Sequence, residues 1–137
     1  MPIDSIQTTV LLRSEQTAGE VSAIENVLPP RFGGPPLHHH DFDETFYVLD
    51  GELELEVAGR RVTACTGEVA FAPRGVVHTL ANLSDAPARY LLVCTPAGFE
   101  RYFDRIAADQ AGAEPAPEGL KPYPETIVVG PPLSAER

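Results

Sequence analysis

Turn residues divide this chain into short runs, and this feature limits its fold more than any other. The 137 residues include 14 prolines and 11 glycines. Proline lacks a backbone N–H donor, and glycine favours tight turns, so neither suits the interior of a long strand or helix. Runs of about five or six residues recur between these turn residues at a spacing of roughly eight to twelve, which is typical of an all-β sandwich or barrel.

Residues 52–57 are the clearest predicted strand. Acidic and aliphatic residues alternate through Glu-Leu-Glu-Leu-Glu-Val, and successive side chains of a strand point to opposite faces of a sheet. Glu52, Glu54 and Glu56 are therefore expected in water and the aliphatic residues in the core. The preceding pair Asp50-Gly51 is a hairpin signal that joins this strand to one over residues 45–49.

The remaining strands follow from similar short runs of β-branched and apolar residues. They are predicted at residues 8–13, 20–28, 60–65, 69–72, 78–82 and 89–94, with a short last strand at 126–129. Residues 29–36 hold four prolines and two glycines, which cannot lie in a sheet interior, and are expected to form a loop.

A single helical pattern appears late in the chain. Phe99, Tyr102, Phe103 and Ile106 recur at helical spacing. Because Thr95 can cap a helix and Pro96 can occupy its first turn, a helix is predicted from about residue 96 to 110. It is expected to pack against the outside of the barrel.

The length of the chain indicates one domain, which can bury roughly two-thirds of its unfolded surface. We expect a loose N-terminal arm at residues 1–7, a β-barrel domain with its helix at 8–110, and a proline-rich tail at 111–137. The β-branched run at residues 8–13 is typical of an edge strand. Since an exposed edge invites pairing with another chain, a homodimer is expected.

Charge and composition exclude several classes of partner. The chain has 20 acidic and 10 basic residues and a formal net charge of −10, which disfavours nucleic acid and anionic membranes. Neither a secretory signal nor a membrane-spanning apolar run is visible, so a cytoplasmic location is expected. Cys65 and Cys94 are too few for a disulfide framework and are expected to be small apolar side chains. Nucleophilic catalysis is unsupported, because no Gly-x-Ser-x-Gly elbow is present.

All four histidines lie in two patterned runs. His38, His40 and Glu44 are separated by even numbers of residues and can point to one side of an extended chain. A neighbouring strand that carries His78 would complete a group of three imidazoles and one carboxylate, which suits a transition metal. His39 has the opposite parity and is expected to face solvent or to support a ligand. A solvated histidine-rich loop is the alternative, but it would not account for the position of His78.

These two runs resemble the paired motifs of the cupin superfamily. The first motif, G-x5-H-x-H-x3-E-x6-G, is matched at His38, His40, Glu44 and Gly51, although four residues rather than five separate Gly33 from His38. The second, G-x5-P-x-G-x2-H-x3-N, is matched in full, at Gly67, Pro73, Gly75, His78 and Asn82. A single H-x-H pattern would be weak evidence. Two spaced motifs that include every histidine, at a ligand position or next to one, are a specific signal.

The resemblance implies a single-domain cupin fold, which is a double-stranded β-helix or jelly-roll barrel, with one C-terminal helix and a proline-rich tail. It implies one divalent transition metal per chain, bound by His38, His40, Glu44 and His78. Mixed nitrogen and oxygen ligation suits Fe, Mn, Ni, Co or Zn, and affinity order alone does not choose among them. Three imidazoles and one carboxylate leave coordination positions open, unlike closed structural zinc sites.

The implied activity is that of a small metal-dependent dioxygenase. The segments 98–103 and 130–133 are similar to those of quercetinase-like cupins, whose substrates are enolisable or flavonol-like aromatic molecules. Glu44 would then serve as both a metal ligand and the general base. Four apolar residues near the ligands in sequence are core by default and could also line a substrate pocket: Phe32, Phe42, Phe46 and Leu80.

Two other functional classes fit the same motifs. One is a non-oxidative cupin, such as an isomerase or polyketide cyclase, in which the metal acts as a Lewis acid. The other is a cupin that binds a small molecule without turnover. One fold hosts many chemistries, so the fold alone does not distinguish them.

Overall fold

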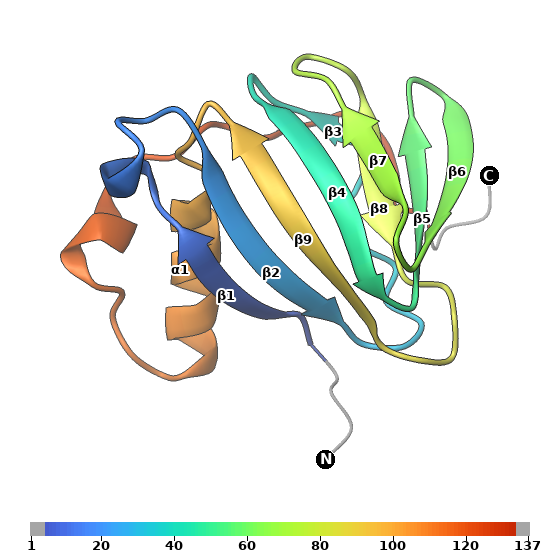
Figure 1. Ribbon diagram of the computed structural model, residues 1–137, viewed down its shortest axis with the longest axis horizontal. Coiled ribbons are helices and arrows are strands. Elements are labelled where there is room, and N and C mark those ends of the chain that lie inside the picture. Colours follow the sequence, from blue (N-terminus) through green and yellow to red (C-terminus); the bar gives the residue numbers. More distant parts are fainter. Residues whose placement is uncertain (1–4, 134–137) are drawn as a thin grey trace.

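The computed structural model describes residues 5–133 and contains two five-stranded sheets that pack face to face (Figure 1). The strand order is β1-β2-β9-β4-β7 in the first sheet and β10-β3-β8-β5-β6 in the second. Every neighbouring pair is antiparallel. This architecture confirms the all-β fold with one C-terminal helix that was expected from the sequence.

The strands lie close to their predicted positions. Those of the first sheet are β1 (Gln7–Leu12), β2 (Ser22–Leu28), β9 (Ala88–Thr95), β4 (Asp43–Asp50) and β7 (Val69–Ala72). Those of the second are β10 (Ile127–Val128), β3 (His38–His39), β8 (His78–Ala81), β5 (Glu52–Val57) and β6 (Arg60–Cys65). The helix is α1 (Glu100–Gln110), and two 3-10 turns are η1 (Ser14–Gln16) and η2 (Pro117–Leu120).

The predicted arm and tail are described only in part. Residues 1–4 of the expected arm and 134–137 of the expected tail lie outside the described residues. β1 is an edge strand, as predicted, and the homodimer stays a prediction. No helix among the described residues is long and apolar enough to cross a membrane.

Alternation along the strands places the core between the two sheets. Leu53 and Leu55 of β5 are fully buried, whereas Glu52 is exposed. Burying each leucine stabilises the fold by roughly 1.5–3 kcal/mol. The turn before β5 requires glycine, because Gly51 has a φ of +88° and an added Cβ would lie 2.7 Å from the carbonyl oxygen of Pro87.

The predicted start of the helix is wrong, since α1 begins at Glu100 rather than near residue 96. Thr95 does not cap the helix because it ends β9 and pairs with Asp43 of β4. Gly98 has a φ of +134°, which no helical residue adopts. The fully buried carboxylate of Glu100 accepts hydrogen bonds from the backbone N–H groups of Gly98 (2.7 Å) and Ser14 (2.8 Å).

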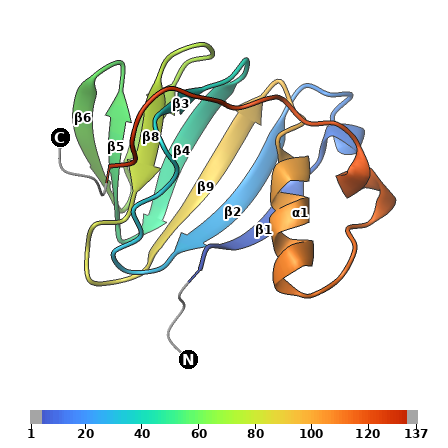
Figure 2. The same ribbon diagram turned by 180° about the vertical axis from the view of Figure 1, so that it is seen from behind.

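The predicted position of the helix outside the barrel is also wrong. α1 lies beside β1 and β2, on the face of the first sheet that the second sheet also covers (Figures 1 and 2). Its aromatic residues line an internal cavity with Leu28 of β2 and Leu92 of β9. After η2 the chain crosses from the side of α1 to β3, where β10 pairs with His38 and His39 (Figure 2). This confirms the predicted last strand.

Candidate metal centre

The two sheets both contribute to a cluster of His38, His40, Glu44 and His78, here called the His/Glu cluster. His38 of β3 and His78 of β8 are direct cross-strand partners in the second sheet. Glu44 belongs to β4 of the first sheet, and His40 lies in the short connection between β3 and β4. The chain passes from one sheet to the other inside this connection, so the cluster lies between the sheets.

All four side chains of the His/Glu cluster are buried. One potential ligand atom from each lies within 4.8 Å of every other. An oxygen of Glu44, Oε1, is 2.7 Å from Nε2 of His78 and 2.8 Å from Nε2 of His40. The structure therefore brings together the four residues that the motifs singled out, at a separation that one ion can span.

Backbone carbonyls fix the tautomers of two of the histidines. Nδ1 of His38 lies 2.7 Å from the carbonyl oxygen of Pro36, and Nδ1 of His78 lies 2.9 Å from that of Val76. A carbonyl oxygen only accepts, so each Nδ1 carries the hydrogen and donates it. The lone pair is left on Nε2, as in histidine metal ligands whose other ring nitrogen is held by a hydrogen bond.

His40 supplies the sharpest test of whether a metal fits. Its ring stacks on Phe42, with centroids 3.7 Å apart and planes 6° from parallel. Neither ring nitrogen has a hydrogen-bond partner, because the close contact with Glu44 lacks hydrogen-bond geometry. Leaving a buried polar atom unpaired costs about 1–3 kcal/mol. An ion between the Nε2 atoms of the histidines and Glu44 would give Nε2 of His40 a partner, so the residues fit a metal.

The charge of the His/Glu cluster also suits a cation. Burial raises the pKa of Glu44, but the contacts with His40 and His78 outweigh it and hold the pKa at about 2. Burial lowers the pKa of His38. Burial also lowers the pKa of His78, but the contact with Glu44 outweighs it and the net shift is upward. A buried carboxylate beside three imidazoles is a nitrogen and oxygen ligand set for one divalent transition metal, whose identity the set does not choose.

A cavity of about 360 Å³, here called the metal-side cavity, opens next to the His/Glu cluster. His38 and Glu44 form part of its wall. The rest is largely apolar: Ile6, Leu28, Phe32, Gly34, Pro35, Pro36, Phe46, Leu80, Tyr90, Leu92, Phe99, Tyr102, Phe103, Ile106, Thr126 and Val128. Among residues 5–133, neither lysine nor arginine lines this cavity.

The residues proposed from sequence as a substrate pocket separate into two groups. Phe32, Phe46 and Leu80 lie on the wall of the metal-side cavity. Phe42 is not part of that wall, because it lies against the His40 ring and is fully buried. The structure thus places Phe42 against a candidate ligand, and its part in a substrate pocket stays a prediction.

The C-terminal tail forms part of the cavity wall, which the sequence did not indicate. Thr126 and Val128 line the cavity, and the N–H of Val129 donates to the carbonyl oxygen of Leu37 at 2.8 Å. The N–H of Leu37 in turn donates to the carbonyl oxygen of Pro131 at 3.3 Å. The β-branched run at residues 126–129 predicted a strand but not its partner. Helical spacing likewise predicted an apolar face on α1 but not that its aromatic residues line this cavity.

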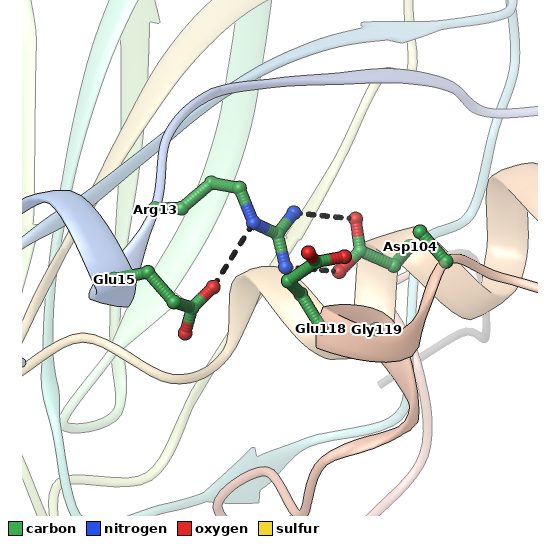
Figure 3. Close-up of a pocket in the computed structure, with 6 residues that line it drawn as sticks. Arg13, Glu15, Asp104, Glu118 and Gly119 are labelled. Carbon is green, nitrogen blue, oxygen red and sulfur yellow. Dashed lines mark hydrogen bonds and ion pairs between the residues drawn. The ribbon is translucent and has the colours of Figure 1, made fainter.

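A second cavity, here called the polar pocket, lies between η1, α1 and η2 (Figure 3). Its volume is about 420 Å³, and its lining residues are Arg13, Glu15, Asp104, Ala116, Glu118 and Gly119. The guanidinium of Arg13 donates to both carboxylate oxygens of Asp104, at 2.9 and 2.8 Å, and to Glu15 at 3.2 Å (Figure 3). No residue of the His/Glu cluster lines this pocket.

Comparison with known proteins agrees with this geometry. Residues 25–94 match the family model described as "Cupin domain". A solved structure described as a predicted oxalate decarboxylase from Thermotoga maritima has a TM-score of 0.62 and 26% identity, covering 66% of this chain and 80% of that one. The polyketide cyclase RemF from Streptomyces resistomycificus has a TM-score of 0.58 and 26% identity, covering 67% and 66%.

A curated relative is similar to this chain over part of its length. The tetracenomycin polyketide synthase protein TcmJ from Streptomyces glaucescens is 33% identical over 60 residues, which are 43% of this chain and 40% of that protein. This chain spans between 22% and 41% of the lengths of the curated relatives that it matches.

Proposed function

This chain belongs to the cupin family, and we propose that it is a metal-dependent enzyme that acts on an enolisable, uncharged aromatic small molecule. One observation carries this proposal. The buried His/Glu cluster, with three imidazoles and one carboxylate, contributes His38 and Glu44 to the wall of an apolar cavity that no lysine or arginine among the described residues lines.

His38, His40, Glu44 and His78 would bind one Fe, Mn, Ni, Co or Zn ion. Such an ion would supply a Lewis acid and open coordination positions for a substrate oxygen. Glu44 would have a role of its own, because its carboxylate is ionised and lies on the cavity wall, where an Oε atom can accept a proton from a substrate hydroxyl. The apolar walls exclude water, which strengthens electrostatic interactions at the site.

The cavity supports a neutral aromatic substrate. Its volume of about 360 Å³ lies at the lower end of the range of about 300–1,000 Å³ for small-molecule sites. Phe32, Phe46 and Phe99 offer ring faces and edges on which a flat molecule can stack. A substrate with several carboxylates would find no cationic side chain in the cavity wall to pair with.

We place dioxygenation of a flavonol-like substrate first, because the motifs of the chain resemble those of quercetinase-like cupins and the ligand set leaves room for substrate and dioxygen. Ring closure of a polyketide is the second candidate. The similarity to RemF and TcmJ favours it, and both reactions start by removal of a proton from an enolisable carbon or hydroxyl. Binding without turnover is the remaining class.

Oxygen uptake separates these candidates. The protein is purified without added metal, its metal content is measured, and it is then loaded in turn with Fe(II), Mn(II), Ni(II), Co(II) and Zn(II). Quercetin and related flavonols are added in an oxygen electrode cell. Oxygen consumption that requires the metal supports dioxygenation. Conversion of an aromatic polyketide that proceeds equally without oxygen supports ring closure, and binding without conversion supports a binding module.

A further inference from the structure

We propose that Tyr90 is a specificity-determining residue whose hydroxyl, on the wall of the metal-side cavity, donates a hydrogen bond to a second oxygen of the substrate. The assignment rests on the proposed function, since it specifies which aromatic molecules the cavity accepts. Tyr90 was not among the residues singled out from the sequence.

The strand register separates the backbone of Tyr90 from that of Glu44. In the first sheet Glu44 of β4 pairs with Cys94 of β9, Phe46 pairs with Leu92, and Val48 pairs with Tyr90. Tyr90 is four residues from Cys94, which corresponds to about 13 Å along a strand. Glu44, Phe46, Leu92 and Tyr90 all line the cavity. The cavity wall is therefore polar at Glu44, apolar in its middle and polar again at Tyr90.

The hydroxyl of Tyr90 has an unused donor. The side-chain amide Nδ2 of Asn26, the cross-strand partner of Tyr90 on β2, donates to the Tyr90 oxygen at 3.1 Å. Within residues 5–133, no hydrogen bond donated by this hydroxyl is present. Tyr90 is 3% exposed and Asn26 is fully buried, so an acceptor for this O–H has to come from within the cavity that Tyr90 lines.

Asn26 also has a polar atom without a hydrogen-bond partner. Its Oδ1 is buried and has no hydrogen-bond partner. Turning the amide over would pair Oδ1 with the Tyr90 hydroxyl but would leave the Asn26 NH2 group without an acceptor. A buried polar group left unpaired costs about 1–3 kcal/mol. The Asn26–Tyr90 pair thus keeps hydrogen-bonding capacity that no described residue uses, at the wall of a cavity suited to a ligand.

The spacing defines the substrate. An oxygen at the His/Glu cluster and an acceptor oxygen at Tyr90, with Phe46 and Leu92 between them on the cavity wall, suit a molecule of about two to three rings. The Phe46 and Tyr90 ring centroids lie 5.9 Å apart, which positions both rings along such a molecule. A substrate that lacks the second oxygen would leave the Tyr90 donor unpaired and would be selected against.

A pair of flavonols tests the assignment. 3-Hydroxyflavone and 3,4′-dihydroxyflavone share the same oxygens at one end and differ by one hydroxyl at the other. Their dissociation constants are measured by absorbance titration against the zinc-loaded protein. We expect the dihydroxy compound to bind about tenfold more tightly, since one hydrogen bond to a buried donor accounts for such a ratio. In Tyr90→Phe the preference should vanish while the affinity for 3-hydroxyflavone stays.

Tyr47→Phe is the matched control. Tyr47 lies on the same pair of strands, but it is 39% exposed and does not line the cavity, so this variant should keep the tenfold preference. A preference that survives in Tyr90→Phe overturns the role of Tyr90 and leaves the proposed function standing. If neither flavonol binds the wild type, the proposed substrate class fails and the role of Tyr90 fails with it. Thermal unfolding of Tyr90→Phe near the wild-type midpoint verifies that the variant folds.

Discussion

The polar pocket and the metal-side cavity have similar volumes, about 420 and 360 Å³, but differ in whether their polar groups are paired. Among the residues that line the polar pocket, Arg13 pairs with Asp104 and Glu15, and no side chain has a buried polar atom without a partner. In the cluster beside the metal-side cavity, both ring nitrogens of His40 lack a partner. Tyr90 on the cavity wall has an undonated hydroxyl hydrogen, and Oδ1 of the adjacent Asn26 has no partner. Unpaired buried groups, more than size, mark the place where a ligand is needed.

The two cavities also differ in what their charges do. The hydrogen bonds with Asp104 raise the pKa of Arg13, so its guanidinium stays charged beside that carboxylate. This pairing joins the start of η1 to α1 and contributes little binding capacity. The Glu44 carboxylate instead lies among three imidazoles, where a metal ion would compensate its charge.

Replacing Glu44 with glutamine should have the largest effect. Glu44→Gln keeps the shape and one coordinating oxygen but removes the charge and the proton acceptor. We expect turnover of a confirmed substrate to fall by about 100-fold or more, with weaker metal binding and an intact fold. Steady-state kinetics, metal analysis and thermal unfolding measure the three effects.

Glu15→Gln is the matched control in the polar pocket, where the same chemical change should leave turnover and metal content unaltered. His78→Ala should mainly cost metal. If Glu44→Gln turns over substrate at the wild-type rate, the carboxylate has no part in the chemistry and a binding module becomes the better description. Loss of the fold together with the metal would instead indicate a structural ion.

Acidification should release the metal and leave the polar pocket unaffected. The pKa of His78 in the metal-free protein is raised above 6.5 by Glu44, and only the neutral imidazole binds a metal. Below that pKa, apparent metal affinity should fall about tenfold per pH unit, because one proton competes for one ligand. The lowered pKa of His38 means that this residue competes only at more acidic pH.

Cobalt(II) titrations followed by visible absorbance between about pH 8 and pH 5.5 measure this effect. Affinity that stays constant well below the usual histidine pKa would contradict ligation by His78. The raised pKa of Arg13 keeps its guanidinium charged over this range, and no residue of the His/Glu cluster lines the polar pocket, so a substitution there should not shift the pH profile.

Weakening the tail should alter ligand exchange, because the tail contacts both cavities. Arg105 of α1 donates to the carbonyl oxygens of Gly119, Leu120 and Lys121, at 3.1, 3.0 and 3.0 Å. Its guanidinium also lies 4.7 Å from the ring centre of Tyr123. Arg105→Ala should cost about 1–2 kcal/mol of stability and speed the release of a bound flavonol severalfold, since residues 126 and 128 form part of the wall.

Stopped-flow displacement of 3-hydroxyflavone measures the release rate, and urea unfolding measures the stability. Arg89→Ala is a suitable control, because Arg89 is half exposed and contacts Glu25 instead of the tail. Equal release rates in wild type and Arg105→Ala would show that the tail does not limit ligand exchange.

The smallest effect is expected from the polar pocket itself. Glu15→Gln removes the contacts of that carboxylate with Arg13 and Arg101, which are partly exposed. Exposed ion pairs contribute about 0–1 kcal/mol, so urea unfolding should show a loss within that range. The hydrogen bond with Arg101 lowers the pKa of Glu15. Its contribution is therefore present above the unfolded pKa of 4.5 and is lost as the pH falls below it. A larger loss would mean that this pocket contributes more than a surface ion pair.

Sequence alone predicted the elements whose patterns are local. The alternation in β5, the hairpin at Asp50-Gly51 and the short strand at β10 depend on neighbouring residues, and their positions agree with the structure. The start of α1 was missed because Gly98 has a positive φ, and its location was missed because helical spacing shows an apolar face but not what covers it.

Ligand chemistry and motif spacing can be read from the order of the residues, so the members of the His/Glu cluster were predictable without a structure. How they meet depends on the packing of the two sheets. His38 and His78 are cross-strand partners, whereas Glu44 comes from the opposite sheet, so the even spacing of the residues identified the right side chains although the chain changes sheet between them. Tyr90, the aromatic face of α1 and the tail reach one cavity from distant parts of the chain, and Asn26 is linked to it through its hydrogen bond with Tyr90. No local pattern encodes such contacts, because they depend on how the sheets and the helix pack together.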